Sequence, residues 1–449
     1  MKSNPLKDNG FVPGDYSQEN YDRIDLHRPY VDNIVLVNAA GKPMYRETDL
    51  IDVWFDSGSM PYAQLHYPFE GEMARGTEAD RQAMIHSDYE GTPIPPAYFP
   101  ADFINEGVDQ TRGWFFTLHA IATMIFDSVA FKNVISTGLV LDAKGNKMSK
   151  HVGNVTNPFE MMEKYGADPV RFYMMTNSEP WDNLKFDPEG VDEVRRKFFG
   201  TLYNTYSFLA LYANVDGFDP ETMLNQGNLA ERPEIDRWII SKANSLIINV
   251  CKQLNDYDPT RAGRLIDNFV NDDLSNWYVR LNRKRFWGKE MDSDKLNAYQ
   301  TLYSCLMTVA KLVAPFAPFY ADRLYHDLGG KMESVHLESY PVADTEAIDA
   351  ELEARMDIAQ KITSMTLALR RKVNIKVRQP LAQLMIPAID DKQKQRICAV
   401  KDLIKNEVNV KEVNFVENSG FLVKKVKCNF RVMGKKFGKL MKSVAAHMD

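Results

Sequence analysis

The chain has few of the features that mark secreted, membrane or metal-binding proteins. Its 449 residues contain only four cysteines, which are far apart and form no C-x-x-C pair: Cys251, Cys305, Cys398 and Cys428. This spacing argues against a zinc ribbon or a disulfide scaffold and favours buried free thiols. No apolar run reaches the roughly 20 residues that a membrane span needs, and the first residues lack the apolar stretch of a signal peptide. We therefore expect a cytoplasmic protein without membrane contact, protein-bound zinc or another metal site.

An excess of positive charge is also lacking, because 55 basic residues face 61 acidic ones and give a net charge of −6. Taken as a whole, this balance does not mark a nucleic-acid-binding protein. The distribution is uneven, since residues 401–449 contain eleven Lys or Arg against five Asp or Glu. Such a cluster can bind phosphates, but a solvated surface is the commoner explanation of a charge run. Its densest part contains Lys424, Lys425, Lys427, Arg431, Lys435, Lys436, Lys439 and Lys442.

Length and hydrophobic pattern predict two to four domains. Residues 1–50 are polar and are expected to be the end of an upstream segment. Residues 51–190 alternate strand-like and helical stretches, which is typical of α/β domains. Residues 191–345 predict long helices with short connections, and hence a bundle, whereas residues 346–449 predict a helix followed by a mixed, basic region. The predicted fold class is therefore α/β plus all-α.

Helical periodicity is clearest in the two C-terminal segments, where apolar residues recur every three or four positions. The first stripe is Ile266, Val270, Leu274, Trp277 and Leu281. The second is Leu302, Leu306, Val309 and Val313, and it is ended by Pro315 and Pro318. The third is Leu352, Met356, Ala359, Ile362, Met365 and Leu369. Each stripe predicts the buried face of one amphipathic helix.

Residues 138–154 read G-L-V-L-D-A-K-G-N-K-M-S-K-H-V-G-N and predict a loop between a strand and a helix. The strand is expected at 134–141. Asn157, followed by a proline, and Asp168 are expected to cap the next two helices. Gly145 allows the loop to bend. Two lysines three residues apart on such a loop suit a polyphosphate whose charge increases during a reaction, although a lysine-bearing surface turn is the safer interpretation of so short a motif.

Lys147-Met148-Ser149-Lys150 resembles the KMSKS loop of class I aminoacyl-tRNA synthetases, which folds over ATP and stabilises the departing pyrophosphate. The resemblance implies that Lys150 binds ATP directly and that Lys147 supports it. It also implies that Ser149 contributes a hydroxyl and a backbone amide. His151 stands where the commonest form of the motif has a second serine, but both lysines that carry the charge are present. ATP accompanied by Mg²⁺ is the cofactor that this resemblance implies.

A second motif, Asn105–Phe115, resembles the E-G-x-D-Q-x-R-G-W-F segment of the isoleucine-specific members of this family. It groups carboxylates, an amide and a guanidinium, which can bind ribose hydroxyls and an ammonium group. By resemblance, Glu106 contacts the aminoacyl-adenylate and Gly107, Asp109 and Gln110 lie beside it. The large aromatic residue that follows, a tryptophan, is interpreted as structural.

Further resemblances extend along the chain in the order of the family. Asp52–Ser59 and Arg23–Pro29 resemble elements of the isoleucine enzymes, and His27 in the second is given no role. Asn271–Arg280 and Ala314–Phe319 resemble the helical anticodon-binding domain of the isoleucine, valine and leucine group. The run from 374 to 381 resembles the segment after that domain, particularly in the eukaryote-like branch of isoleucine enzymes.

Basic residues at the end of the first of these helical motifs are candidates for contacts with tRNA phosphates. A solvated helix face explains them equally well. They are Arg280, Arg283, Lys284 and Arg285.

Together the resemblances imply the second half of a Rossmann-like class I catalytic domain, an anticodon-binding bundle and a small mixed C-terminal region. The family's H-I-G-H element is missing, since no H-x-G-H occurs in the 449 residues, and there is no room for the inserted editing domain. We therefore expect a C-terminal fragment of an isoleucine-specific ligase, inactive alone but able to bind tRNA(Ile), with isoleucine and ATP as substrates and no oligomer. Two alternatives remain: a free-standing tRNA-binding protein with a vestigial loop, and the valine enzyme.

Overall fold

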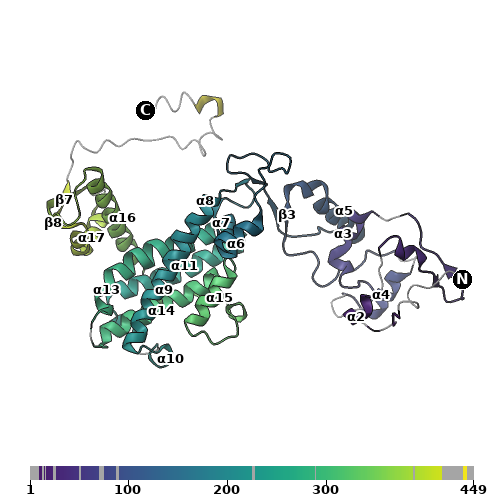
Figure 1. The fold of residues 1–449 in the computed structure, drawn as a ribbon, viewed down its shortest axis with the longest axis horizontal. Coiled ribbons are helices and arrows are strands. Elements are labelled where there is room, and N and C mark those ends of the chain that lie inside the picture. Colours follow the sequence, from purple (N-terminus) through teal and green to yellow (C-terminus); the bar gives the residue numbers. More distant parts are fainter. Residues whose placement is uncertain are drawn as a thin grey trace. The chain divides into compact units, whose positions relative to one another are not determined.

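The computed structural model describes residues 10–441, except 13–14, 16, 24–26, 50–51, 70–74, 87–89, 225–227, 289, 388–389 and 417–437. Figure 1 shows the fold as a ribbon whose colour follows the sequence. By its contacts the chain divides into two compact units, which we call unit one (Met1–Leu139 and Pro180–Asn183) and unit two (Val140–Glu179 and Leu184–Asp449). Each unit has a hydrophobic core of its own. None of the described helices is long and apolar enough to cross a membrane.

Unit one contains a strand–helix–strand element, in which a helix connects two parallel neighbouring strands. Glu106 on the first strand lies opposite Ser136 on the second. This is the α/β pattern that the sequence predicts for the segment, and the first strand leads into the helix through a short 3-10 turn. The elements are β3 (Ile104–Gly107), η2 (Val108–Arg112), α5 (Trp114–Phe126) and β4 (Val134–Thr137).

Helix α3 (Val53–Ala63) packs against α5 and closes the core of unit one. Asp52 caps the helix, because its carboxylate accepts a hydrogen bond from the backbone N–H of Trp54 at 2.9 Å. Gly58 allows the close approach of the two helices, since a Cβ at this position would lie 2.8 Å from Ile121 Cδ1. The other elements of unit one are α2 (Gln18–Tyr21), η1 (Tyr30–Asn33), β1 (Leu36–Val37), β2 (Pro43–Met44) and α4 (Glu78–Ile85).

Unit two begins with a small α/β part. Strand β5 pairs in parallel with β6, and the loop that contains the two lysines follows β5. The predicted cap at Asn157 is confirmed, because its side chain accepts a hydrogen bond from the N–H of Phe159 at 3.0 Å. The elements are β5 (Val140–Leu141), α6 (Pro158–Tyr165), α7 (Ala167–Asn177), β6 (Leu184–Lys185) and α8 (Pro188–Val194).

The predicted cap at Asp168 is wrong. The carboxylate of this buried residue accepts a hydrogen bond from the N–H of Tyr320 at 2.6 Å, so that it caps α15 (Pro318–Asp327) instead of its own helix. Arg171, one turn further along α7, donates to the carbonyl oxygens of Phe316 and Pro315 at 3.3 and 3.2 Å. These contacts fasten α7 to the turn at the start of α15.

The rest of unit two is a helical bundle, and its core contains the predicted stripes. In the first stripe four of the five side chains are buried and Leu281 is half-buried, and in the second all four have no exposed surface. Two stretches, η3 and η5, are π-helical. The elements are η3 (Arg195–Phe199), α9 (Gly200–Asp216), α10 (Pro220–Met223), η4 (Leu229–Glu231), α11 (Glu234–Asn255), α12 (Pro259–Asn268), η5 (Phe269–Val279), α13 (Arg280–Phe286), α14 (Ser293–Val313), α15 (Pro318–Asp327), η6 (Val335–Leu337), η7 (Thr345–Ala347) and α16 (Ala350–Lys372).

The C-terminal half of α16 departs from the third predicted stripe. Met365 is 68% exposed and Leu369 is 61% exposed, whereas Thr366 and Arg370 are buried in their place. Beyond this helix the predicted mixed region is a parallel pair of strands with two helices between them. Its elements are β7 (Leu381–Pro387), α17 (Asp391–Ala399), α18 (Lys401–Val408) and β8 (Val410–Val416), and η8 (Gly438–Leu440) follows. Most of the predicted basic cluster after residue 417 lies outside the described residues.

Candidate active site and nucleic-acid interface

In unit one the candidate adenylate-binding residues lie at the carboxyl end of β3. Ligands of open α/β sheets bind at this end of the strands. Glu106 is exposed on the strand, and its Oε1 accepts a hydrogen bond from the N–H of Gly107 at 3.1 Å. A Cβ at position 107 would lie 2.5 Å from Asp109 Oδ1, so a larger residue here would displace this exposed carboxylate. Gln110 donates to Asp109 Oδ2 at 3.1 Å. The four predicted residues therefore lie together in one turn.

Trp114 has a structural role, as the sequence predicts. Its side chain is half-buried, and the indole N–H donates to the carbonyl oxygen of Ser57 at 2.9 Å. Its backbone N–H donates to Gln110 Oε1 at 3.0 Å. The motif at the start of α3 and the motif after β3 are therefore parts of one folded element. The motif at 23–29 is described only in part, because residues 24–26 lie outside the described residues.

In unit two the lysine loop is a tight reversal of the chain. Leu141 and Lys147 form an antiparallel bridge, and Gly145 at the turn has a φ of +88°, a backbone conformation that favours glycine. The Lys147 and Lys150 side chains are exposed. Neither ammonium group pairs with a residue in the part of the chain that the structure describes. Two unpaired cations are therefore available to an anionic ligand.

Met148, between the lysines, anchors the loop to the body of unit two. It packs against a buried apolar cluster that the elements after the loop build. The Met148 side chain thus holds the backbone of the loop against the core, while the two lysine side chains remain exposed. The cluster consists of Val170, Tyr173, Leu184, Phe186 and Val191.

Asp142 and Asn154, at the two ends of the loop, bind each other and the backbone between them. Asn154 Nδ2 donates to Asp142 Oδ2 at 3.0 Å and to the carbonyl oxygen of Lys147 at 3.2 Å. Asn154 Oδ1 accepts from the N–H of Ser149 at 2.8 Å. Asp142 also accepts from the N–H of Asn146 at 2.7 Å. The bonds from Asn154 and Asn146 lower the pKa of Asp142 to about 2.

These contacts change the prediction for Ser149. Its backbone amide is bound by Asn154, so of the two predicted contributions only the hydroxyl remains available, and that oxygen accepts from the N–H of His151 at 3.2 Å. Asp142 and Asn154 are not among the residues predicted from the sequence. The signal was present, since short polar residues that can bind backbone groups stand at both ends of a loop with flanking glycines.

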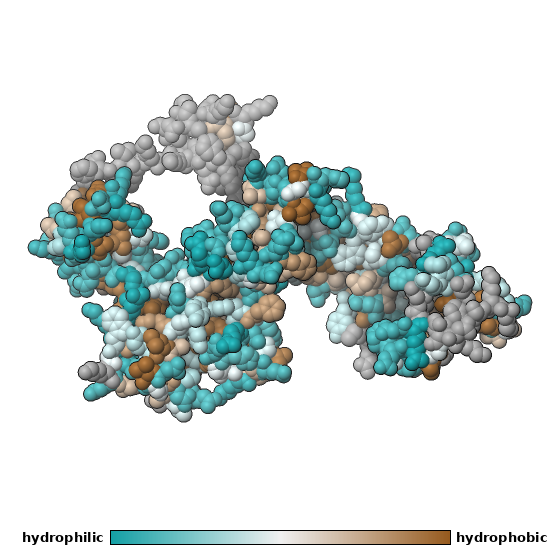
Figure 2. Space-filling view, viewed as in Figure 1, coloured by the Kyte–Doolittle hydropathy of each residue, from teal (hydrophilic) through white to brown (hydrophobic). Residues whose placement is uncertain are grey.

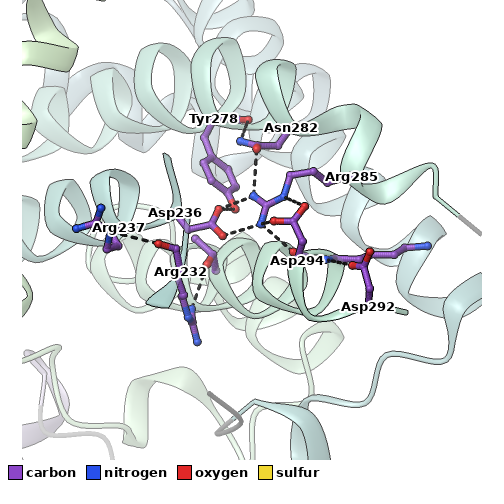
Figure 3. A network of polar contacts seen from close by, with 10 residues as sticks. Arg232, Asp236, Arg237, Tyr278, Asn282, Arg285, Asp292 and Asp294 are labelled. Atoms are coloured by element: carbon purple, nitrogen blue, oxygen red, sulfur yellow. Dashed lines mark hydrogen bonds and ion pairs between the residues drawn. The ribbon is translucent and has the colours of Figure 1, made fainter. Parts of the chain in front are cut away.

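The bundle contains a buried polar network at the candidate tRNA-binding helix, which Figure 3 shows. Asp236, with no exposed surface, accepts from the Tyr278 hydroxyl at 2.7 Å and from two nitrogens of Arg285 at 2.7 and 2.8 Å. The same guanidinium donates to Asn282 Oδ1 and twice to Asp294. Burial lowers the pKa of Arg285, but the hydrogen bonds and charge of Asp236 outweigh it and raise the pKa overall.

The predicted contact of Arg285 with tRNA stays a prediction, which its contacts within the protein do not favour. A guanidinium has five N–H groups, and all five of Arg285 are directed at protein acceptors. Arg280 is partly occupied, since it forms an ion pair with Glu407. Arg283 and Lys284 are exposed, and neither side chain pairs with any residue among those described. Only these two cations of the predicted group are fully available.

No predicted residue lies in a metal site. Within the described part of the chain, no group of three or more His, Cys, Asp or Glu side chains could hold a metal ion. Of the three cysteines described, Cys305 is buried, Cys251 is half-buried and Cys398 is exposed, and all three are free.

Hydrophilic residues cover most of the bundle in the view of Figure 2, with apolar patches scattered among them.

The fold and the two motifs agree with comparisons to known families. Residues 12–187 match the family described as tRNA synthetases class I (I, L, M and V), and residues 236–386 match the anticodon-binding domain of tRNA ligase. The chain therefore combines a portion of a class I synthetase catalytic domain with an anticodon-binding domain, as its sequence predicts.

Along almost all of its length the chain is similar to isoleucine--tRNA ligases. It is 64% identical over 452 residues to that of Bacteroides thetaiotaomicron, a match that covers 99% of this chain and 37% of the relative. It is 61% identical over 446 residues to that of Porphyromonas gingivalis, with 99% and 37% covered. With that of Dehalococcoides mccartyi it shares 44% over 408 residues, with 90% and 38% covered. The chain thus spans little more than a third of the length of these relatives.

These relatives are bacterial, and they give no support to the predicted likeness to a eukaryote-like branch. A solved structure, the ternary complex of Agrobacterium radiobacter K84 agnB2 LeuRS-tRNA-LeuAMS, matches with a TM-score of 0.52 and 19% identity. The match covers 72% of this chain and 37% of that chain. At this identity the likeness concerns the fold alone.

Proposed function

We propose that this chain is part of an isoleucyl-tRNA synthetase and supplies its ATP-binding lysine loop and its anticodon-binding bundle. The whole enzyme ligates isoleucine to tRNA(Ile) through an isoleucyl-adenylate. The observation that carries the proposal is the lysine loop. It presents two ammonium groups, which pair with none of the described residues, on a backbone held by Asp142 and Asn154. The identity of 64% to an isoleucine--tRNA ligase supports the choice of amino acid.

In the first step the carboxylate of isoleucine attacks the α-phosphate of ATP, and pyrophosphate leaves. Lys150 binds the phosphates and Lys147 supports it, so that their charges offset the charge that develops on the leaving group. The Ser149 hydroxyl adds one hydrogen bond. Mg²⁺ bound with ATP supplies further neutralisation of the phosphates. Catalysis of this kind depends on positioning and charge stabilisation and needs no side-chain nucleophile.

The turn after β3 binds the adenylate. The exposed carboxylate of Glu106 suits the ammonium group of the amino acid or a ribose hydroxyl, and Asp109 and Gln110 support the turn from Gly107 onward. In the second step a ribose hydroxyl at the 3′ end of the tRNA attacks the carbonyl carbon of the adenylate and releases AMP. None of the residues named above forms a covalent intermediate with the substrate.

The bundle binds tRNA(Ile), with Arg283 and Lys284 at phosphates and Arg280 as a weaker contributor. The protein acts as a monomer in the cytoplasm. The 449 residues contain no H-x-G-H element, so this chain alone binds tRNA without catalysing amino-acid activation.

The decisive experiment is isoleucine-dependent exchange between ATP and pyrophosphate, measured on the full-length protein that contains this chain. We expect exchange with isoleucine and little with valine. Lys150→Ala should lower the exchange rate by about 10²- to 10³-fold, the usual cost of one transition-state donor. Lys144→Ala is the matched control, because Lys144 is an exposed lysine of the same loop with no proposed role, and it should leave the rate unchanged.

Two outcomes would overturn parts of the proposal. Exchange that valine stimulates far more than isoleucine would make this part of the valine enzyme. Absence of exchange with either amino acid, together with retained tRNA binding, would favour a tRNA-binding protein with a vestigial loop. The absence of H-x-G-H from the 449 residues is the observation that keeps this second candidate open.

A further inference from the structure

Helices α16 and α18 end close to each other, and an asparagine with a left-handed backbone follows each of them. Asn374 follows α16 with a φ of +55°, and Asn409 follows α18 with a φ of +51°. Asparagine tolerates this conformation better than most residues. Asn409 Nδ2 also donates to the carbonyl oxygen of Val377 at 2.8 Å. The loop after α16 is therefore tied to the end of α18.

Arg370, in the last turn of α16, strengthens this connection from the inside. Its side chain is only 3% exposed. One terminal nitrogen donates to the carbonyl oxygens of Lys376 and Gln379 at 3.2 and 3.0 Å, and the other donates to those of Val408 and Asn409 at 2.8 and 3.0 Å. No carboxylate of the described residues takes part. The carbonyl end of α18, which carries partial negative charge, replaces one.

The end of α16 and the loop after it carry four exposed cations, and we call this segment the basic loop: Arg371, Lys372, Lys376 and Arg378. None of the four forms an ion pair with a residue that the structure describes. Two exposed valines lie among them, Val373 at 63% and Val377 at 44%. The buried arginine holds the backbone of this surface, and all the charges of the surface point outward. The surface is therefore preorganised for an anionic partner.

A second basic segment is connected to the same end of α18. Arg280, at the start of α13, forms an ion pair with Glu407, the residue before Val408. Arg283 and Lys284 follow within the next turn of α13. The candidate tRNA-binding turn of the bundle and the basic loop are therefore both tied to the three residues 407–409.

We propose that the basic loop binds the phosphates of folded RNA, with tRNA as the partner, and that it extends the surface formed by Arg283 and Lys284. The inference deepens the proposed function and rests on it. Phosphate groups suit the forked guanidiniums of Arg371 and Arg378. The exposed valines suit the apolar faces of riboses or bases beside those phosphates. Because the net charge of the chain is −6, the attraction of a polyanion depends on local clusters of positive charge such as this one.

The test measures binding of a tRNA(Ile) transcript to the 449-residue chain by fluorescence anisotropy over a range of salt concentrations. The variant replaces all four cations of the basic loop by alanine. We expect Kd to rise by at least about tenfold at low salt, and the slope of log K against log salt to become shallower by about 3, since each phosphate contact contributes about 0.7 to 0.9. The four side chains are exposed, so the variant should keep the melting temperature of the unaltered chain.

The matched control replaces Lys252 and Lys392, two exposed lysines elsewhere in unit two, and should leave both Kd and the salt slope unchanged. Binding by the four-alanine variant that equals the control would overturn the inference and leave the proposed function intact. Failure of the unaltered chain to bind tRNA at low salt would overturn both. Poly-glutamate is added as a competitor, and equally strong binding of this acidic polypeptide would also overturn the assignment to RNA.

Discussion

Asp236 and Arg285 are buried charges in the bundle that depend on each other. Arg285→Met removes the partner of a carboxylate with no exposed surface and also leaves the Tyr278 hydroxyl beside an unpaired charge. Breaking such a pair from one side costs about 3–5 kcal/mol, so we expect this loss in the free energy of unfolding, measured by urea titration. Arg283→Met, two positions earlier and exposed, should cost less than about 0.5 kcal/mol. Equal effects of the two substitutions would contradict the assignment of Arg285 to the fold.

Asn154 is a single residue on which the conformation of the lysine loop depends. Asn154→Ala removes the bonds to Asp142, Lys147 and Ser149, so the loop between residues 142 and 154 should open more often. We expect limited trypsin digestion to cleave after Lys147 and Lys150 several-fold faster than in the unaltered chain.

Val155→Ala is the control for this digestion, because Val155 is an exposed neighbour with no role in the loop. It should be cleaved at the same rate as the unaltered chain. Unchanged cleavage of the Asn154 variant would contradict the role of Asn154 in holding the loop.

At the level of elements, α16 and the loop after it depend on Arg370. Arg370→Met removes a donor from four carbonyl oxygens, of which those of Lys376 and Asn409 also accept from the N–H groups of Gln379 and Leu381. An unsatisfied buried polar group costs about 1–3 kcal/mol. We expect a loss of about 2–4 kcal/mol in stability after partial relaxation of the loop. Arg371→Met, its exposed neighbour, should cost less than about 0.5 kcal/mol. Thermal unfolding followed by circular dichroism compares the two, and a difference below 1 kcal/mol would contradict this role.

The helices of the bundle could be predicted from the sequence because their partners lie on one face at a regular spacing. The stripe from Leu302 to Val313 is an example, since all four of its side chains are fully buried. Single polar residues could not be predicted in the same way. Asp168 binds Tyr320, which lies 152 residues away, and Arg285 binds Asp236 at a separation of 49. Local spacing contains no information about such partners.

The positions of the candidate site residues could be predicted from the sequence, whereas the contacts that hold these residues in place could not. Motifs located both the turn at Glu106 and the lysine loop, whose residues lie next to each other in the sequence. The same motifs did not show that the Ser149 amide is already bound by Asn154. In α16 the apolar spacing continues through Met365 and Leu369, but the interior at this end of the helix is polar and takes Arg370. A polar interior reverses the face that hydrophobic periodicity predicts.

At the level of the whole molecule, the two units differ in the size of their cores. The core of unit one is a small cluster around Tyr62, Leu118 and Phe126, whereas that of unit two extends through the whole bundle. Because the protection of an amide depends on how much structure must open to expose it, we expect faster hydrogen exchange in α5 than in α11 and α14. Exchange of the intact chain followed by mass spectrometry measures this, and equal protection of the three helices would contradict it.

Helix α7 contributes to two cores at once. Val170 and Tyr173 belong to the cluster on which Met148 of the lysine loop rests, and Phe172 between them belongs to the core of the bundle. Arg171 and Asp168 fasten the same helix to the start of α15. A force that displaces the bundle must therefore bend α7 or carry Met148 with it. We therefore expect a displacement of the bundle, which is proposed to bind tRNA, to be transmitted through α7 to the loop proposed to bind ATP.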